Sequence, residues 1–157
     1  MFSDRPCFCQ SLQFYSQCCQ PYHLGKKTDT AEQLMRSRYS AYVLQDIAYI
    51  VNTTVPAQQD LLNQAAMLQW SKDTEWDGLD IIRHISKLDK IHAQVEFKAY
   101  YLTEHGRDFH HELSAFVRIG QQWYFLDPTV QQILSMKQPC LCGSAKKFKY
   151  CCAPFLA

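Results

Sequence analysis

The sequence predicts an α+β fold in which helices pack on a curved antiparallel sheet, with a small cysteine-rich unit at each end of the chain. Three observations carry this prediction. All eight cysteines fall near the two termini. Between them, apolar residues first recur at three- and four-residue steps, which is typical of helices, and later alternate, which is typical of strands. The chain therefore divides into an N-terminal unit at 1–27, a central domain at 28–134 and a C-terminal unit at 135–157.

The composition is that of a folded protein without a strong overall charge. Of 157 residues, 47% are hydrophobic and 13% aromatic, which is enough for one domain with a core. Lys and Arg number 16 against 15 Asp and Glu, so no overall field indicates nucleic acid or a membrane surface as partner. The chain begins without a secretory signal, and its most apolar run, 41–51, contains Gln45 and Asp46. We therefore expect a cytoplasmic protein that contacts no membrane, with reduced thiols.

The cysteines form one pattern that occurs twice. Each set reads C-x-C-x8-C-C, and a constant offset relates the two copies, pairing Pro6 with Pro139 and Ser11 with Ser144 as well. Four thiolates brought together by a short loop are typical of a tetrahedral zinc site. The expected metal ligands are Cys7, Cys9, Cys18 and Cys19 in the first copy and Cys140, Cys142, Cys151 and Cys152 in the second.

The thiol pattern leaves alternatives open. Adjacent cysteines can also be inert buried thiols, and Gln10 stands in the N-terminal copy where the C-terminal copy has Gly143. A single mixed site with ligands from both termini is a further alternative. A closed four-thiolate site leaves no position for water or substrate, so zinc here would be structural rather than catalytic. We expect two zinc ions, with the C-terminal site the stronger.

One segment is similar to a known motif. Residues 139–152, PCLCGSAKKFKYCC, resemble the SEC-C motif, the zinc-binding tail of the SecA translocation motor and of many bacterial proteins. Two such units around the segment 34–43, LMRSRYSAYV, resemble the YchJ family over almost the whole chain. Four positions depart from the usual motif, two that lack a proline and two that lack a glycine: Phe8, Leu141, Gln10 and Ala145. The resemblance implies metal ligation by the cysteines and, for SEC-C units, contact with a chaperone or the ribosome.

The first half of the central domain has helical patterning. Thr30 and Gln33 form a capping-box arrangement, so a helix should begin near Ala31 and either continue or break near Asp46. Apolar residues predict a second helix at 58–71, and Pro56 suits its start.

The second half has strand patterning. Candidate strands lie at 79–87, 91–103, 109–119 and 122–127, separated by turn residues. Helices followed by an antiparallel meander define an α+β arrangement, with one face of the sheet buried on the helices. The resemblance to the YchJ family implies in addition the cone-shaped fold named after nuclear transport factor 2.

Folds that resemble this cone often hold a ligand between sheet and helices. The pocket candidates are Arg36, Arg38, Tyr39, Trp76, Tyr101, Glu112, Ser114 and Trp123. The alternative is that Glu112 forms a salt bridge with Arg36 or Arg38 and that the aromatic residues are core. His110 and His111 should point to opposite faces of their strand, so they should not converge on one ligand.

The sequence assigns no catalytic residue, because it contains no nucleophile elbow, glycine-rich phosphate loop or zinc-protease motif. The favoured function is a zinc-binding, non-enzymatic adaptor whose C-terminal unit contacts an acidic protein surface, or the ribosome and its RNA. The alternative is an isomerase, dehydratase or hydrolase with its pocket in the central domain. An alternative role for the lysines of the C-terminal unit is that they only balance the negative charge of the thiolates. The partner-contact candidates are Lys146, Lys147, Phe148, Lys149 and Tyr150.

Overall fold

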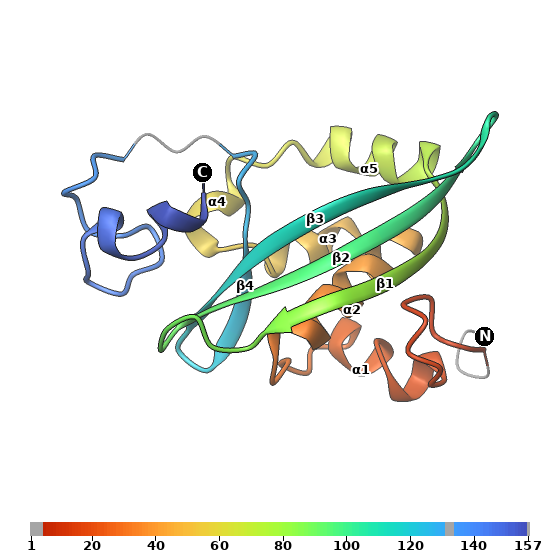
Figure 1. Ribbon diagram of the computed structural model, residues 1–157, viewed down its shortest axis with the longest axis horizontal. Coiled ribbons are helices and arrows are strands. Elements are labelled where there is room, and N and C mark those ends of the chain that lie inside the picture. The colour runs from red at the N-terminus through yellow and green to blue at the C-terminus, as the bar shows by residue number, and fades with distance from the viewer. Residues whose placement is uncertain (1–4, 131–133, 157) are drawn as a thin grey trace.

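A computed structural model describes residues 5–130 and 134–156 of the chain (Figure 1). Its α-helices are α1 (Gln20–His23), α2 (Ala31–Val43), α3 (Ile47–Asn52), α4 (Pro56–Gln59) and α5 (Gln64–Asp73). Its strands are β1 (Glu75–Ile85), β2 (His92–Thr103), β3 (Gly106–Ile119) and β4 (Gln122–Leu126). The 3-10 helices η1 (Tyr15–Gln17), η2 (Phe148–Tyr150) and η3 (Ala153–Phe155) belong to the cysteine-rich units.

The four strands form one antiparallel sheet in the order β1-β2-β3-β4. The hairpin of β2 and β3 is the longest pairing, and its register runs from His92 opposite Val117 to Thr103 opposite Gly106. Register shifts in β1 mark bulges, which bend a strand and increase its twist. The curled sheet crosses the helical layer (Figure 1). The predicted α+β class is therefore confirmed.

Side-chain caps fix where the first long helix ends and the next begins. The Thr30 hydroxyl accepts a hydrogen bond from the Gln33 amide at 3.1 Å, so α2 begins as predicted. After α2, Gln45 adopts a φ of 60°, and the Asp46 carboxylate then caps α3 by accepting from the Tyr49 amide at 3.2 Å. The helix therefore breaks at Asp46, which the sequence pattern had left open.

The single helix predicted at 58–71 is wrong, because two helices occupy this segment. α4 begins at Pro56 and ends at Gln59, and α5 begins only at Gln64. The intervening Asn63 accepts a hydrogen bond from the Ala66 amide at 3.0 Å, which starts a new helix. The Gln58 side chain is buried and bonds both backbone groups of Asp127, which ties α4 to the end of β4.

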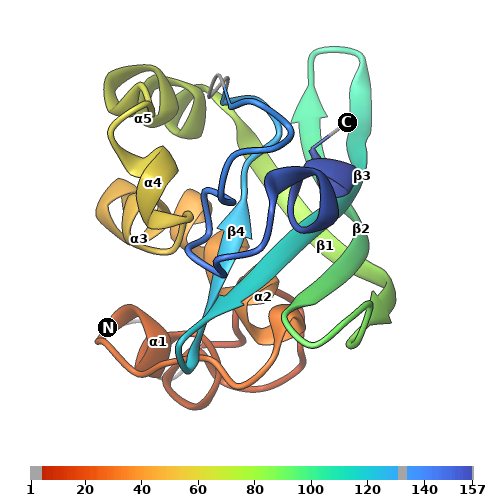
Figure 2. The ribbon, with the colours of Figure 1, turned by 90° about the vertical axis from the view of Figure 1, so that its left-hand side faces the viewer.

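The two faces of the sheet bury different partners. The inner face, which we define as the face toward α2, packs residues such as Val95 and Phe116 against Leu34. The outer face packs Ala115 and Val117 of β3 against the C-terminal unit. Figure 2 shows this unit lying against β3 and β4. The sheet is therefore covered on both sides near β4, but by elements from different ends of the chain.

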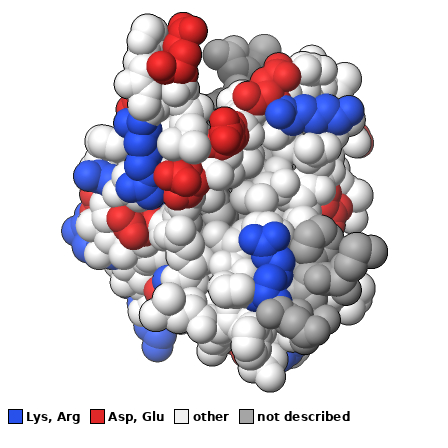
Figure 3. All heavy atoms as spheres, turned by 90° about the vertical axis from the view of Figure 1, so that its right-hand side faces the viewer, with Lys and Arg blue, Asp and Glu red and all other residues white. Residues whose placement is uncertain are grey.

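Charges of both signs are interspersed on the side of the molecule that lies at the right of Figure 1, with no large patch of one sign (Figure 3). One pair links Arg107 to Asp77 at 2.7 Å. Within the described ranges, no helix is long and apolar enough to cross a bilayer.

Candidate functional site: two cysteine clusters and a central pocket

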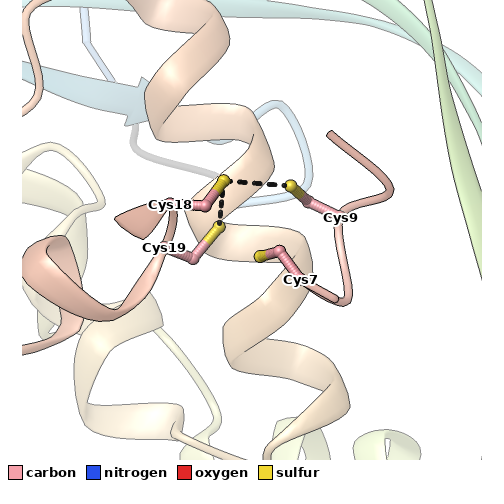
Figure 4. A group of neighbouring side chains, drawn as sticks. All are labelled: Cys7, Cys9, Cys18 and Cys19. Atoms are coloured by element: carbon pink, nitrogen blue, oxygen red, sulfur yellow. Dashed lines mark hydrogen bonds between the residues drawn. The ribbon is translucent and has the colours of Figure 1, made fainter. Parts of the chain in front are cut away.

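The N-terminal cysteines converge beside α2 (Figure 4). All four sulfur atoms lie within 4.8 Å of one another, with Cys9 3.5 Å and Cys19 3.9 Å from Cys18. Cys18 is half-buried and the other three are buried. Thiolates bound to one tetrahedral zinc at about 2.3 Å would lie about 3.8 Å apart, so the spacing and the donor set fit zinc.

The C-terminal cysteines repeat this geometry. Their sulfur atoms also lie within 4.8 Å of one another, and all four residues are buried. Cys142 and Cys151 are 3.5 Å apart, as are their counterparts in the first cluster. A serine hydroxyl lies beside the third cysteine of each motif, Ser11 at 3.1 Å from Cys18 and Ser144 at 3.2 Å from Cys151. The sequence repeat is thus also a structural repeat.

The loop between the cysteine pairs keeps its shape despite the sequence departures. Gly143 has a φ of 82°, and Gln10 takes a φ of 61° at the corresponding position. Leu12 and Ala145 also correspond, with φ values of 72° and 68°. Non-glycine residues rarely adopt this left-handed conformation. The loop therefore keeps its shape without these glycines, but its backbone is locally strained.

The thiols of each cluster have pKa values shifted in opposite directions. A hydrogen bond with Cys152 lowers the pKa of Cys142 to about 4, while burial raises the pKa of Cys151 to about 12. In the first cluster, a hydrogen bond with Cys18 lowers the pKa of Cys9 to about 6. Some thiols thus ionise only while their neighbours stay protonated. Four thiolates in one buried cluster require a compensating cation, as a bound metal ion supplies.

Each cluster also receives a polar contact from the central domain. The Ser40 hydroxyl of α2 donates to Cys19 at 3.3 Å, and an Arg36 guanidinium nitrogen donates to the Cys9 carbonyl at 3.0 Å. Figure 4 shows the first cluster against this helix. Ser40 could not be found from the sequence pattern, because its proximity to Cys19 depends on how α2 packs.

At the C-terminal cluster the contact comes from β2. His92 is buried, and its Nε2 lies 3.3 Å from the Cys152 sulfur. Its Nδ1 lies 2.8 Å from the Asp89 carboxylate, which only accepts hydrogen bonds when ionised. The His92 ring also packs on Phe155 with centroids 4.6 Å apart. Sequence reasoning missed both His92 and Asp89, which lie far from the motif along the chain.

The two clusters are separate, and each has four cysteines from one end of the chain. The N-terminal cluster packs with α2 and the inner-face residues, whereas the C-terminal cluster packs with the outer face. Figure 1 places the N-terminal unit near β1 and the C-terminal unit beside β4. The single mixed site is therefore excluded.

A pocket of about 930 Å³ lies between the inner face of the sheet, α2 and α5. Five of the predicted pocket residues line it: Arg38, Tyr39, Trp76, Glu112 and Ser114. Tyr101 stacks on His110, which is itself a lining residue, with ring centroids 4.6 Å apart. Trp70 of α5 also lines the pocket and was not predicted, although its apolar position on a predicted helix was a signal.

Two predicted pocket residues lie elsewhere. Arg36 points to the N-terminal cluster and pairs with Glu32 at 3.1 Å. Trp123 donates to the Asp29 carbonyl at 3.1 Å and lines a smaller pocket of about 280 Å³. Glu112 is exposed and forms an ion pair with neither arginine among the described residues. The alternative salt bridge between Glu112 and Arg36 or Arg38 is therefore not formed among the described residues.

The partner-contact candidates differ in exposure. Tyr150 is 71% exposed, and Lys146 and Lys147 are exposed as well. The Lys149 ammonium lies 4.8 Å from the centre of the Tyr150 ring. Phe148 is buried in the C-terminal unit, so it is unavailable for contact. Its counterpart Tyr15 is buried too, which explains the aromatic residue at this position as part of the unit's own core.

Comparison with protein families gives two matches. Residues 30–128 match the model described as YchJ, middle NTF2-like domain, and residues 136–154 match the SEC-C motif. A UPF0225 protein of Actinobacillus succinogenes is 50% identical over 96% of this chain and 97% of its own. A UPF0225 protein of Haemophilus influenzae strain Rd is 52% identical over 96% of this chain and 92% of its own.

Two solved structures have the same fold. A SEC-C motif containing protein from Psychrobacter arcticus superposes with a TM-score of 0.95 at 50% identity, covering 98% of each chain. A SEC-C motif containing protein from Rhodopseudomonas palustris superposes with a TM-score of 0.71 at 32% identity, covering 78% of this chain and 96% of its own.

Proposed function

The chain belongs to the YchJ family and carries a SEC-C motif, and we propose that it is a zinc-binding adaptor without catalytic activity. The observation that supports this proposal best is the pair of four-cysteine clusters, each with its sulfur atoms within 4.8 Å of one another. Each closed set leaves no coordination position for a substrate, so zinc would fold and fix the two units. Reduced thiols of this kind suit the cytoplasm.

The C-terminal unit is proposed as the contact site. Its basic surface, defined as Lys146, Lys147, Lys149 and Tyr150, combines cations with an exposed aromatic ring. Residues 134–156 contain four lysines and no acidic residue, whereas a zinc ion with four thiolates carries a charge of −2. The unit thus retains positive charge after zinc binding. This charge favours an acidic protein as the partner.

The proposed zinc content is tested by metal analysis of the purified protein. We expect two zinc ions per chain under reducing conditions. Cys140→Ser and Cys7→Ser should each remove one ion, because each variant breaks one cluster and leaves the other complete. Retention of two ions in either variant, or no zinc in the unsubstituted protein after supplementation, would contradict two independent sites.

The contact surface is tested with defined polyanions. A fluorescent polyglutamate chain should bind the zinc-loaded protein, and Lys146→Glu with Lys147→Glu should weaken binding about tenfold or more. The matched control is Lys26→Glu with Lys27→Glu, which reverses two exposed lysines of the N-terminal unit. An equal loss of polyglutamate binding in the two variants would show that binding depends on the overall charge of the protein rather than on the C-terminal surface. Preferential binding of a uridine oligonucleotide would assign the surface to RNA instead.

A further inference from the structure

A buried arginine that forms no ion pair with a described residue lines the pocket of the central domain, and among the described carboxylates only the more distant Asp127 acts on its charge. Arg38 is buried and lines the pocket. Its Nη1 donates to the Ile50 carbonyl at 2.9 Å and to the Thr53 hydroxyl at 2.8 Å, and its guanidinium lies over the Phe125 ring at 4.4 Å. These partners are all neutral, and no described carboxylate forms an ion pair with Arg38. Buried charges are normally paired.

The other two guanidinium nitrogens of Arg38 are free to bind a ligand. Neither Nε nor Nη2 has a hydrogen-bond partner within residues 5–130 and 134–156. The only side-chain nitrogen or oxygen in these ranges that is both sealed from solvent and unpartnered is Nε1 of Trp76. The unpartnered nitrogens of Arg38 therefore keep access to solvent, which the pocket provides. A guanidinium edge with two free donors matches a carboxylate.

The rest of the pocket is suited to an apolar body. Trp70 and Trp76 meet edge to face with centroids 5.1 Å apart, and Tyr42 lies 5.3 Å from Trp70. Met35 and Met67 also line this region and adapt readily to the shape of a ligand. Pockets of this size with apolar walls and a few polar groups are typical of small-molecule sites.

Two acidic residues restrict the charge of the ligand. Glu112 and Asp127 both line the pocket. The Asp127 carboxylate is occupied by the Thr129 amide and hydroxyl at 2.8 and 2.6 Å, and Glu112 is exposed. Both would repel a second negative group on a ligand that is held by Arg38. A single carboxylate is therefore favoured over a phosphate or a dicarboxylate.

We propose that this pocket binds an amphipathic monocarboxylate, with the carboxylate on Arg38 and the apolar body against Tyr42, Trp70 and Trp76. The proposal assigns a site distinct from the two cysteine clusters, because the pocket includes no cysteine, although Phe155 of the C-terminal unit is one of its lining residues. It assigns a binding site and no reaction.

The test compares three ten-carbon probes, decanoate, decanol and decyltrimethylammonium, by calorimetry and by tryptophan fluorescence. Decanoate should bind and change the fluorescence of Trp70 and Trp76. Replacing the carboxylate by a hydroxyl should weaken binding about tenfold or more, as expected when a hydrogen bond to a charged group is lost. Tighter binding of the cationic probe, or no binding of decanoate, would overturn the proposal.

Two variants locate the site. Arg38→Gln should lose the preference for decanoate over decanol. Because Arg38 also holds Ile50 and Thr53, this variant is checked for folding, and Ala66→Trp provides a second test. Ala66 is an exposed lining residue of α5, so the added ring should fill the pocket and weaken decanoate binding about tenfold.

The control is Ala65→Trp, on the same exposed helix but outside the lining residues. It should change decanoate binding by less than about twofold, the usual range for surface substitutions. Equal effects at 65 and 66 would show that decanoate binds elsewhere, and zinc content serves as an independent measure of folding in every variant.

Discussion

At the scale of single residues, each cysteine cluster receives a contact from the central domain on the last cysteine of its motif. Ser40 of α2 donates to Cys19, and His92 of β2 lies 3.3 Å from Cys152. Polar partners of this kind orient metal ligands, and their loss typically lowers metal affinity by about 10- to 100-fold. The two cysteine-rich units are therefore joined to the fold through their cysteines as well as through apolar packing.

The His92→Phe variant should release zinc from the C-terminal cluster more readily. The substitution keeps an aromatic ring beside Phe155 but removes the contacts with Cys152 and Asp89. We expect zinc affinity at this site to fall by about 10- to 100-fold. Competition with a chromophoric chelator measures the affinity, and Cys7→Ser removes the N-terminal site so that only one ion is followed.

The control is His111→Phe, which removes an exposed histidine paired with Glu96 on the outer face. Its zinc affinity should match that of the unsubstituted protein. An equal loss in the two variants would mean that His92 acts only through general stability.

At the scale of elements, the N-terminal unit meets β1 where this strand has a bulge. Gly78 has a φ of 133°, and its amide donates to the Tyr39 hydroxyl at 2.9 Å. A Cβ at this glycine would lie 2.8 Å from the side-chain amide of Gln10, whose oxygen accepts from the Leu79 amide at 3.4 Å. The bulge thus lets the strand approach both α2 and the cysteine-rich loop.

Gly78→Ala should destabilise the zinc-loaded protein by about 1–3 kcal/mol, the usual range for a residue forced into a rare backbone conformation. The free energy of unfolding is measured with urea in the presence of zinc. Gly25→Ala is the matched control, since Gly25 also has a positive φ, 114°, but no atom within 4 Å of an added Cβ. A cost at Gly78 no larger than at Gly25 would contradict a role for the contact with Gln10.

At the scale of the whole molecule, the two cysteine-rich units cover different faces of the central domain. The C-terminal unit buries Ala115 and Val117 on the outer face, while the N-terminal unit packs with Leu34 and Leu79. Beyond the reach of the C-terminal unit, Phe109 and Leu113 of β3 remain 44% and 49% exposed. Metal binding at each terminus should therefore protect a separate part of the core.

Cys152→Ser should expose the outer face near β4 without unfolding the domain. Loss of the metal loosens the C-terminal unit, so amide hydrogen exchange should increase in β4 and in β3 around Ala115 and Val117. Exchange in β1 should change little. Cys19→Ser is the corresponding variant of the N-terminal cluster and should increase amide hydrogen exchange in α2 instead. Uniform loss of protection across all strands in either variant would contradict separate coverage.

Much of the central fold could be predicted from local patterns. Thr30 caps α2 at the predicted start, and β2 and β4 lie within one residue of their predicted bounds. β1 begins four residues and β3 three residues earlier than predicted, and the Gln33 side chain accepts from the Asp29 amide instead of completing a capping box on Thr30. The break at Asn63 was missed because apolar spacing alone does not separate one helix from two. Local patterns did not show what covers the outer face of β3, since Val117 packs against the C-terminal unit, which lies outside the central domain.

The pocket was predicted in part. Arg36 and Arg38 lie two residues apart on α2, and sequence reasoning placed both in the pocket. They lie about 200° apart around a helix axis, so they cannot face the same side. Arg38 lines the pocket and Arg36 reaches the N-terminal cluster, a choice that depends on how α2 is rotated against the sheet.

The two four-cysteine units could be predicted from the sequence alone, because each complete ligand set lies in one short segment whose spacing closes the cluster locally. Where these units attach, and which side chains support them, depends on tertiary packing. His92 approaches Cys152 across 60 positions of sequence, and Ser40 approaches Cys19 across 21. Such contacts depend on strand register and helix packing, which are set by the burial of the whole core rather than by any local pattern.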